Sequence, residues 1–150
     1  LHAAAGLNQW DQSGAPDPEY AEHVYFMELA ADTEQESLVM LSNAQQSTAV
    51  SIRHNVSQLP FFSLWKNTVG TSDGYVTGLE PATNFPNPHS FEKQHDRTIH
   101  LGPGNDYTMS LHIGLLTEPT AIQAALEKIE MLQPEATEIH EGPTSDWCST

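Results

Sequence analysis

The pattern of apolar and polar residues along the chain predicts a mainly β protein. Short segments rich in β-branched and aromatic residues are separated by polar turns, as is typical of antiparallel strands. The predicted strands cover residues 23–29, 36–41, 48–54, 59–67, 74–80, 97–101 and 107–116. In the last strand Leu111 and Ile113 alternate with Ser110 and His112, which predicts one buried face. The regular spacing predicts a meander, and the turn at 102–106 is expected to join its last two strands into a hairpin.

One amphipathic helix is predicted late in the chain, over residues 118–132. Ile122 and Leu126 recur at a four-residue step, so this helix is expected to pack its apolar face on a sheet. Thr117 is expected to cap the helix, and Pro119 suits its first turn. Many short strands and a single helix favour an antiparallel β-sandwich over a closed barrel.

The composition predicts one folded domain and a tail. A chain of 150 residues with 38% apolar content is long enough to bury one core. Residues 133–150 contain prolines and scattered charge without a hydrophobic period, which predicts an extended or disordered tail. We therefore expect residues 1–132 to form the folded domain.

The charge balance narrows the possible partners. Five basic residues against twenty acidic ones give a net charge of −15, which argues against nucleic acid as a partner. The chain has no apolar run near the ~20 residues of a membrane-spanning helix, so we expect no membrane span. A single cysteine, Cys148, allows no internal disulfide and says little about the compartment, for which we favour the cytoplasm.

The segment GLEPATNFPN, residues 78–87, is the strongest candidate for a functional site. In a strand, Val76, Gly78 and Glu80 lie on one face. Because Gly78 has no side chain, a ligand has room to lie against the strand and meet the Glu80 carboxylate. Pro81 cannot donate to a sheet ladder, so we expect the strand to end there, with Glu80 at its rim.

Other side chains near Glu80 suggest a carbohydrate site. Trp65 and Lys66 end the preceding predicted strand, and Asn84 follows on the loop. An aromatic ring beside a cation, a carboxylate and amides suits a sugar, which stacks on the ring and hydrogen-bonds through its hydroxyls. Trp65 is equally compatible with a core position, and Lys66 with a solvated strand end. His23, at the start of the first strand, is a further candidate to face the groove in which a sugar would bind.

A metal site is not expected. His89, His95 and His100 are six and five residues apart across a loop, and this spacing matches no zinc pattern. Solvated loop histidines are the better interpretation.

Four segments in fixed order resemble the aldose 1-epimerase (galactose mutarotase) superfamily and, more closely, an uncharacterised aldose-1-epimerase-like family. They are a VYF strand, an LP…WKN strand, the YVTGLEPATNFPN strand and loop, and an L-x-PG turn, at 23–29, 59–67, 75–87 and 101–104. The resemblance covers roughly residues 7–132. It implies that residues 1–132 are the C-terminal part of a galactose-mutarotase-like β-sandwich, since whole members are about twice as long as this chain.

The resemblance also implies a reaction, the interconversion of sugar anomers by general acid–base catalysis without metal or cofactor. The family's base is the glutamate of its Leu-Glu strand end, which corresponds to Glu80. The base takes the proton of the anomeric hydroxyl while a histidine protonates the ring oxygen. In the family that histidine lies in the half that precedes this segment. Trp65, Lys66, Asn84 and His23 are the expected sugar contacts.

Two other classes of function stay open. A non-catalytic carbohydrate-binding or assembly module would keep the same fold, and a groove without an acid histidine facing Glu80 would favour it. A structural protein without a ligand predicts that Trp65 and Lys66 point away from Glu80. The expected partners are a small-molecule sugar and either the missing N-terminal half or a second copy, which would cover exposed sheet edges.

Overall fold

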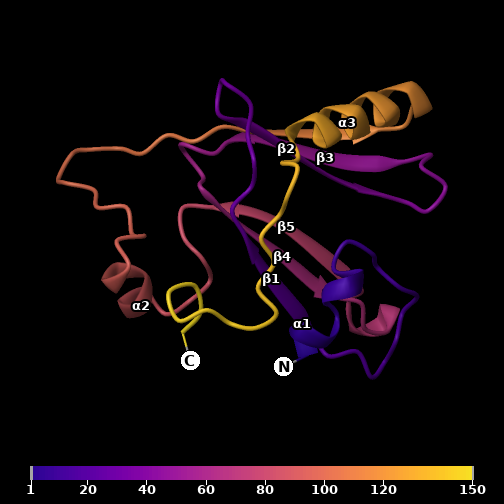
Figure 1. Cartoon of the computed structure of the whole chain (residues 1–150), viewed down its shortest axis with the longest axis horizontal. Coiled ribbons are helices and arrows are strands. Elements are labelled where there is room, and N and C mark those ends of the chain that lie inside the picture. Colours follow the sequence, from indigo (N-terminus) through magenta and orange to yellow (C-terminus); the bar gives the residue numbers. More distant parts are fainter. Residues whose placement is uncertain (1, 150) are drawn as a thin grey trace. The chain divides into compact units, whose positions relative to one another are not determined.

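The computed structural model describes residues 2–149 and is mainly β, as predicted (Figure 1). Its strands are β1 (His23–Met27), β2 (Glu36–Ser42), β3 (Ala49–Asn55), β4 (Phe61–Asn67), β5 (Val76–Ala82) and β6 (Leu111–Leu116). Its helices are α1 (His2–Ala5), α2 (His89–Gln94) and α3 (Pro119–Leu132), with single 3₁₀ turns η1 (Leu7–Gln9) and η2 (Thr71–Asp73). The strands form two antiparallel sheets, which confirms the predicted fold class.

The chain divides into two compact units, each with one sheet. Unit 1 comprises Leu1–Met27, Phe61–Thr98 and Glu138–Thr150, and unit 2 comprises Glu28–Pro60 and Ile99–Thr137. The sheet of unit 1 has the strand order β1-β4-β5, and that of unit 2 the order β2-β3-β6. The predicted meander is therefore wrong, because β1 pairs with β4 and β3 pairs with β6 across long stretches of chain.

The sheet of unit 1 buries side chains on both faces. One face carries Tyr25, Phe62 and Leu64, all buried. The other face carries Phe26 and Phe61, whose rings pack against the fully buried Phe85 from the loop after β5. Burial on two faces explains why β4 lacks the alternation of a half-buried strand, since Phe62, Ser63 and Leu64 are buried in succession.

In unit 2, α3 packs on its sheet as predicted. The helix contacts β2 and β6, and Figure 1 shows it beside β2. Ile122, on the predicted apolar face, is 1% exposed. The N-cap is Glu118 rather than Thr117, and its side chain makes no capping hydrogen bond. The helix therefore depends on packing of its apolar face more than on its cap.

The strand predicted at 97–101 is absent, and so is the hairpin predicted to follow it. The N-terminal half of 107–116 is not a strand either, because β6 begins at Leu111. Here side chains replace ladder hydrogen bonds: the Tyr107 hydroxyl donates to the Gln58 carbonyl oxygen at 2.5 Å, and the Ser110 N–H donates to Gln58 Oε1 at 3.0 Å. Such long-range contacts leave no local signal in the sequence.

The apolar face predicted for the last strand exists, but it is not buried. Leu111, Ile113 and Leu115 of β6 are all exposed in the described chain.

Two features of the 76–97 segment differ from prediction. β5 runs through Pro81 to Ala82, with Pro81 opposite Phe62. Within the described residues β5 is paired on one side alone, and proline is tolerated at such an edge because the missing N–H can face away from the partner strand. The loop beyond contains α2, which the sequence pattern did not predict.

The segment after α3 has neither helix nor strand within its described residues, 133–149. Its end, around Trp147, nevertheless packs on the loop after β5. No described helix has the length and apolar character needed to cross a membrane.

Replacing Ile122 by alanine should lower the free energy of unfolding by about 2–5 kcal/mol, because a buried aliphatic side chain leaves a cavity against the sheet. Met131→Ala on the same helix, at a position 79% exposed, should change it by less than about 0.5 kcal/mol. Urea unfolding followed by circular dichroism measures both. Equal effects of the two substitutions would contradict the packing of α3 through Ile122.

Candidate functional site

Glu80 and Trp65 lie on the same face of the β1-β4-β5 sheet. Glu80 is opposite Ser63 and Gly78 is opposite Trp65 in the antiparallel register, and opposite residues share a face. The alternation predicted for Val76, Gly78 and Glu80 is therefore present. Glu80 is exposed at the edge strand, while Trp65 is half-buried on the neighbouring strand.

The Glu80 side chain folds back over Gly78. Its Cδ lies 3.1 Å from the position that a Cβ at residue 78 would take, and its Oε1 lies closer still. The space left by glycine is thus occupied by the Glu80 carboxylate itself, directly across from Trp65. A side chain at position 78 would force this carboxylate out of that space.

Trp65 is held in place from the other side of its strand. Its Nε1 donates a 3.0 Å hydrogen bond to Glu22 Oε2, and Val24 of β1 lies opposite it, 38% exposed. The indole is therefore neither a core residue nor a free surface side chain. Together with the Glu80 carboxylate it forms an open face, partly apolar and partly acidic.

Lys66 lies on the opposite face of the sheet from Glu80. It is opposite His23 and Thr77 in the register and is 5% exposed. Its ammonium donates to the backbone carbonyl oxygens of Gln9 and Gln12, at 2.7 and 2.6 Å. Burial lowers the pKa of Lys66 from its ordinary value. The lysine anchors the N-terminal segment to the sheet and is not a solvated strand end.

His23 also lies away from Glu80, in a cluster with two tyrosines. The hydroxyls of Tyr20 and Tyr25 each lie 3.1 Å from its Nδ1. Burial is the main cause that raises the pKa of the Tyr25 phenol. Gly6 packs so closely here that a Cβ would fall 2.7 Å from the Tyr25 hydroxyl oxygen. The N-terminal segment therefore closes over this cluster.

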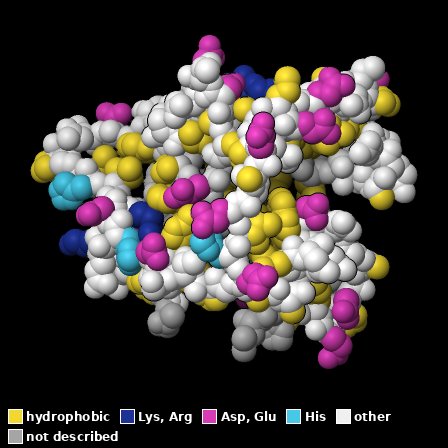
Figure 2. All heavy atoms as spheres, viewed as in Figure 1, with side chains coloured by type: hydrophobic (Ala, Val, Ile, Leu, Met, Phe, Trp, Pro, Cys, Tyr) yellow, Lys and Arg dark blue, Asp and Glu magenta, His cyan; other side chains and the backbone are white. Residues whose placement is uncertain are grey.

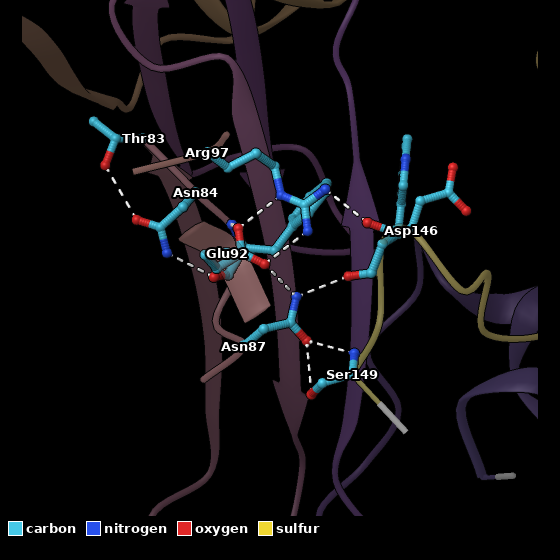
Figure 3. Close-up of polar contacts among 9 residues, drawn as sticks. Thr83, Asn84, Asn87, Glu92, Arg97, Asp146 and Ser149 are labelled. Carbon is cyan, nitrogen blue, oxygen red and sulfur yellow. Dashed lines mark hydrogen bonds and ion pairs between the residues drawn. The ribbon is translucent and has the colours of Figure 1, made fainter. Parts of the chain in front are cut away.

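Asn84 is engaged within its own loop. Its Nδ2 donates to the Phe85 carbonyl oxygen at 2.7 Å, and its Oδ1 lies 3.2 Å from the Thr83 hydroxyl (Figure 3). The amide thus shapes the turn that follows β5.

The loop after Glu80 is organised by a buried ion pair that the sequence analysis missed (Figure 3). Glu92 is 1% exposed and receives two hydrogen bonds from the Arg97 guanidinium, Nε to Oε2 at 2.7 Å and Nη2 to Oε1 at 2.8 Å. Asn87 Nδ2 donates to Oε1 at 2.7 Å and the Phe85 N–H donates to Oε2 at 3.2 Å. Hydrogen bonding by Arg97 holds the pKa of Glu92 below its usual value although burial opposes this.

The end of α2 brings the two charges together. Asp96 has a φ of 56°, in the left-handed region, and the Arg97 N–H donates to the Glu92 carbonyl oxygen at 2.9 Å. The Asp96 N–H donates to the Lys93 carbonyl oxygen at 3.3 Å, which completes a Schellman motif. Glutamate and arginine five residues apart, around an aspartate able to adopt positive φ, are the local signal that could have predicted the pair.

The same cluster holds the C-terminal segment. Arg97 Nη1 donates to the Asp146 carbonyl oxygen at 2.6 Å, and Asn87 Nδ2 donates to the Trp147 carbonyl oxygen at 2.8 Å. The Ser149 N–H donates in turn to Asn87 Oδ1 at 3.0 Å. The Trp147 ring packs on Phe85, with centroids 5.0 Å apart. The end of the segment expected to be an extended or disordered tail is therefore tied to the loop that follows Glu80.

Phe85 joins this loop to the face of the sheet that carries Glu80. Its ring stacks on Phe26 at 4.6 Å with an interplanar angle of 8°, and it lies 4.6 Å from the Phe61 ring. By the register, Phe26 and Phe61 share their face with Glu80 and Trp65. The loop thus folds back over one part of the face and leaves the Glu80 carboxylate exposed in another.

Few cations are available to a ligand. Acidic side chains are spread over the surface seen in Figure 2, with Lys and Arg in few places. Arg53 lies 3.8 Å from Glu36 and Lys128 lies 3.5 Å from Asp32, in each case between side-chain atoms. Of the five basic residues, Lys93 on α2 is the one for which the described structure gives no acidic or carbonyl partner.

Neither the histidines nor the hollows of the described chain add a second site. His95 packs on Phe91 at 4.5 Å, and residues 2–149 contain no group of three His, Cys, Asp or Glu side chains placed to hold a metal ion. A hollow of about 550 Å³ in unit 2 lies beside α3, where Gln45, Gln123 and Glu127 line it. Glu80 and Trp65 are not among its lining residues.

Comparison with known proteins agrees with this fold. Residues 1–115 match the family described as "Domain of unknown function (DUF4432)". The crystal structure of a Klebsiella pneumoniae subsp. pneumoniae MGH 78578 protein, described as "a putative aldose 1-epimerase", is similar with a TM-score of 0.85 and 31% sequence identity. No curated protein matches the chain. The predicted resemblance to aldose 1-epimerase-like proteins is thereby confirmed.

The region of similarity to the Klebsiella protein covers most of this chain but a smaller share of the Klebsiella chain. It spans 89% of this chain and 35% of the Klebsiella chain, so this chain spans about a third of that protein's length.

Replacing Glu92 by glutamine should destabilise the fold by about 3–5 kcal/mol, because the Arg97 charge would stay buried without its carboxylate. Glu138→Gln removes a carboxylate from an exposed pair with His140 and should cost less than about 0.5 kcal/mol. Thermal or urea unfolding measures both. A Glu92→Gln protein as stable as the Glu138→Gln protein would contradict the role assigned to the pair.

The same pair should make stability depend on acidity. Because the folded-state pKa of Glu92 is depressed, its contribution is fully present above the ordinary pKa of 4.5 and is lost as the pH falls through the lower folded value. The difference in unfolding free energy between wild type and Glu92→Gln should therefore be constant from neutral pH to about 5 and shrink below that. Urea titrations at several pH values test this, and a difference that grows in acid would contradict it.

Proposed function

The chain belongs to the family described as "Domain of unknown function (DUF4432)", and we propose that it acts on sugars as part of an aldose 1-epimerase-like protein. The proposed reaction is the interconversion of sugar anomers by general acid–base catalysis. The observation that carries the proposal is the exposed Glu80 carboxylate, which lies over Gly78, the residue opposite the half-buried Trp65 in the strand register.

Glu80 is the proposed base. A carboxylate that takes the proton of the anomeric hydroxyl allows the sugar ring to open, and closure after rotation about the C1–C2 bond gives the other anomer. Gly78 leaves room for the carboxylate to lie against the sheet face, at a position opposite Trp65 in the strand register, where a bound sugar could meet it. Besides the proton transfers, the reaction breaks the bond between C1 and the ring oxygen and re-forms it without a net change of oxidation state, so it calls for no metal or redox cofactor.

Trp65 is the proposed binding platform. The apolar face of a pyranose can stack on the indole, whose orientation is set by the hydrogen bond to Glu22. We leave Lys66 and His23 out of the proposed contacts, because they lie on the other face of the sheet. Asn84 lies on the loop that follows Glu80 and therefore stays near the proposed site. Its Nδ2 is not free for a sugar, because it donates to the Phe85 carbonyl oxygen.

The proposed substrate is a neutral sugar. A phosphorylated sugar would bring negative charge to a chain with a net charge of −15. The basic side chains of unit 1 that lie near the sheet or its loop are committed, Lys66 to two carbonyl oxygens and Arg97 to Glu92. These commitments leave no cation beside Glu80 on β1, β4 or β5.

A second candidate function is a non-catalytic carbohydrate-binding module. The observation that favours it is that β1, β4 and β5 present no histidine on the Glu80 face, since His23 lies on the other one. Catalysis therefore requires an acid from outside these strands, whereas sugar binding on Trp65 does not.

In the enzyme, Glu80→Gln should slow anomer exchange by about 10²–10⁴-fold, because the base is lost while the shape of the side chain is kept. Nuclear magnetic resonance exchange between the α and β anomers of a panel of neutral aldoses measures the rate. Glu130→Gln, an exposed carboxylate on α3, is the matched control and should not change the rate.

The outcomes separate the two candidates. Exchange at the wild-type rate in Glu80→Gln would exclude Glu80 as the base. Sugar binding without exchange, lost in Trp65→Ala, would establish the binding module. A wild-type protein that neither binds nor exchanges any sugar of the panel would contradict both.

A further inference from the structure

His54 of β3 is a buried titratable side chain that the proposed reaction does not use. It is 1% exposed, and its Nδ1 has no hydrogen-bond partner among the described residues. Buried polar nitrogen atoms are almost always hydrogen-bonded, so an exception calls for an explanation. An imidazole can stay buried in this way while it is neutral. An imidazolium has two N–H donors and a full charge, and burying it without partners costs far more free energy.

The strands on either side of His54 offer its ring no opposite charge. β3 is the central strand of the β2-β3-β6 sheet. In the register Ser37 of β2, which is 3% exposed, and Leu111 of β6 lie opposite His54. One neighbour is a small buried hydroxyl group and the other is apolar. Neither side chain carries a charge that could balance an imidazolium.

The charged groups around His54 are engaged with other residues. Of those on β2, β3, β6 and α3 in the described chain, the Glu36 carboxylate is the one that acts on His54, and it favours the charged form. That carboxylate lies 3.8 Å from Arg53 Nε and accepts a 3.2 Å hydrogen bond from Asn55 Nδ2. His112 of β6 is opposite Arg53 and therefore lies on the other face. Burial has the larger effect and lowers the pKa of His54 from its ordinary value of 6.5.

The start of β6 is the element that can open most readily beside His54. Among the described residues β6 pairs with β3 alone. Leu111 is the first residue of β6, so the pair that it forms with His54 lies at the end of the ladder. The end of a ladder on an edge strand opens at a lower cost in free energy than the middle of a strand paired on both sides. Opening of this end brings water to the imidazole.

We propose that His54 makes the pairing of β3 and β6 sensitive to acid. While the imidazole is neutral it stays buried and the two strands remain paired. When it takes up one proton from the solvent, the start of β6 separates from β3 and water hydrates the imidazolium. The step transfers a single proton and breaks no covalent bond. The inference concerns unit 2 and does not depend on the proposed reaction.

The direction of the pH dependence follows from the buried neutral ring. Above pH 6.5, the ordinary pKa of histidine, His54 is neutral in the paired and the open form alike, so it makes their equilibrium independent of pH. Below 6.5 the open form binds a proton that the paired form does not. The open fraction therefore rises by up to about tenfold for each pH unit, until the pH falls below the lower pKa of the paired form.

Hydrogen exchange followed by mass spectrometry tests the proposal on the 150-residue chain. Between pH 7.5 and 5.5 the protection factors of the wild-type β6 amides, corrected for the intrinsic exchange rate, should fall about fivefold or more. In His54→Leu, which places an apolar side chain of similar size at this position, they should stay constant. His112→Leu makes the same change at an exposed histidine of β6 and is the matched control, which should behave as wild type.

A second measurement needs no substitution. In the nuclear magnetic resonance spectrum of wild type, the assigned ring signal of His54 in the paired form should keep its neutral chemical shift at pH 6.0, where an ordinary histidine is mostly protonated. Titration of this signal as an ordinary histidine with β6 still protected would overturn the proposal. So would wild-type protection of β6 that is the same at pH 7.5 and 5.5, or an equal loss of protection in His54→Leu. The wild-type chain decides the first two outcomes even where His54→Leu does not fold.

Discussion

The buried ion pair between Glu92 and Arg97 is the constraint on which the order of unit 1 around its candidate site depends. A carboxylate that is 1% exposed is tolerated because its oxygens receive hydrogen bonds from Arg97, Asn87 and the Phe85 N–H. The same arginine and asparagine bind carbonyl oxygens of the C-terminal segment. One pair of charges thus fixes a loop, a short helix and a chain end, none of which has a sheet ladder to hold it.

Phe85 connects the loop that Glu92 and Arg97 organise to the β1-β4-β5 sheet. Glu92 holds the Phe85 backbone, and the ring stacks on Phe26 and Phe61 of two different strands. That packing covers one part of the face and leaves Trp65 and Glu80 in the rest. Because successive residues of a strand point to opposite faces, Trp65 lies on the sheet face that carries Glu80, whereas the Lys66 ammonium is bonded to the N-terminal segment on the other face.

The epimerase-like fold and the proposed chemistry stand on different evidence. The fold follows from the strand register, the two antiparallel sheets and a TM-score of 0.85. Function depends on side chains at a site, and one fold supports several functions. In unit 2, Leu111, Ile113 and Leu115 of β6 are exposed in the described chain, so the apolar alternation of that strand is not explained by burial.

Local periodicity was enough to predict most strands, the α3 helix and the shared face of Val76, Gly78 and Glu80, because alternation and helical repeats are properties of neighbouring residues. The sequence pattern also carried the epimerase-like resemblance through the order of its motifs. Tertiary structure alone decided that Lys66 and His23 face away from Glu80, that residues 97–101 form no strand, and that Glu92 meets Arg97 beneath the C-terminal segment. These outcomes depend on the strand paired opposite and on buried contacts between distant segments, which a local pattern does not encode.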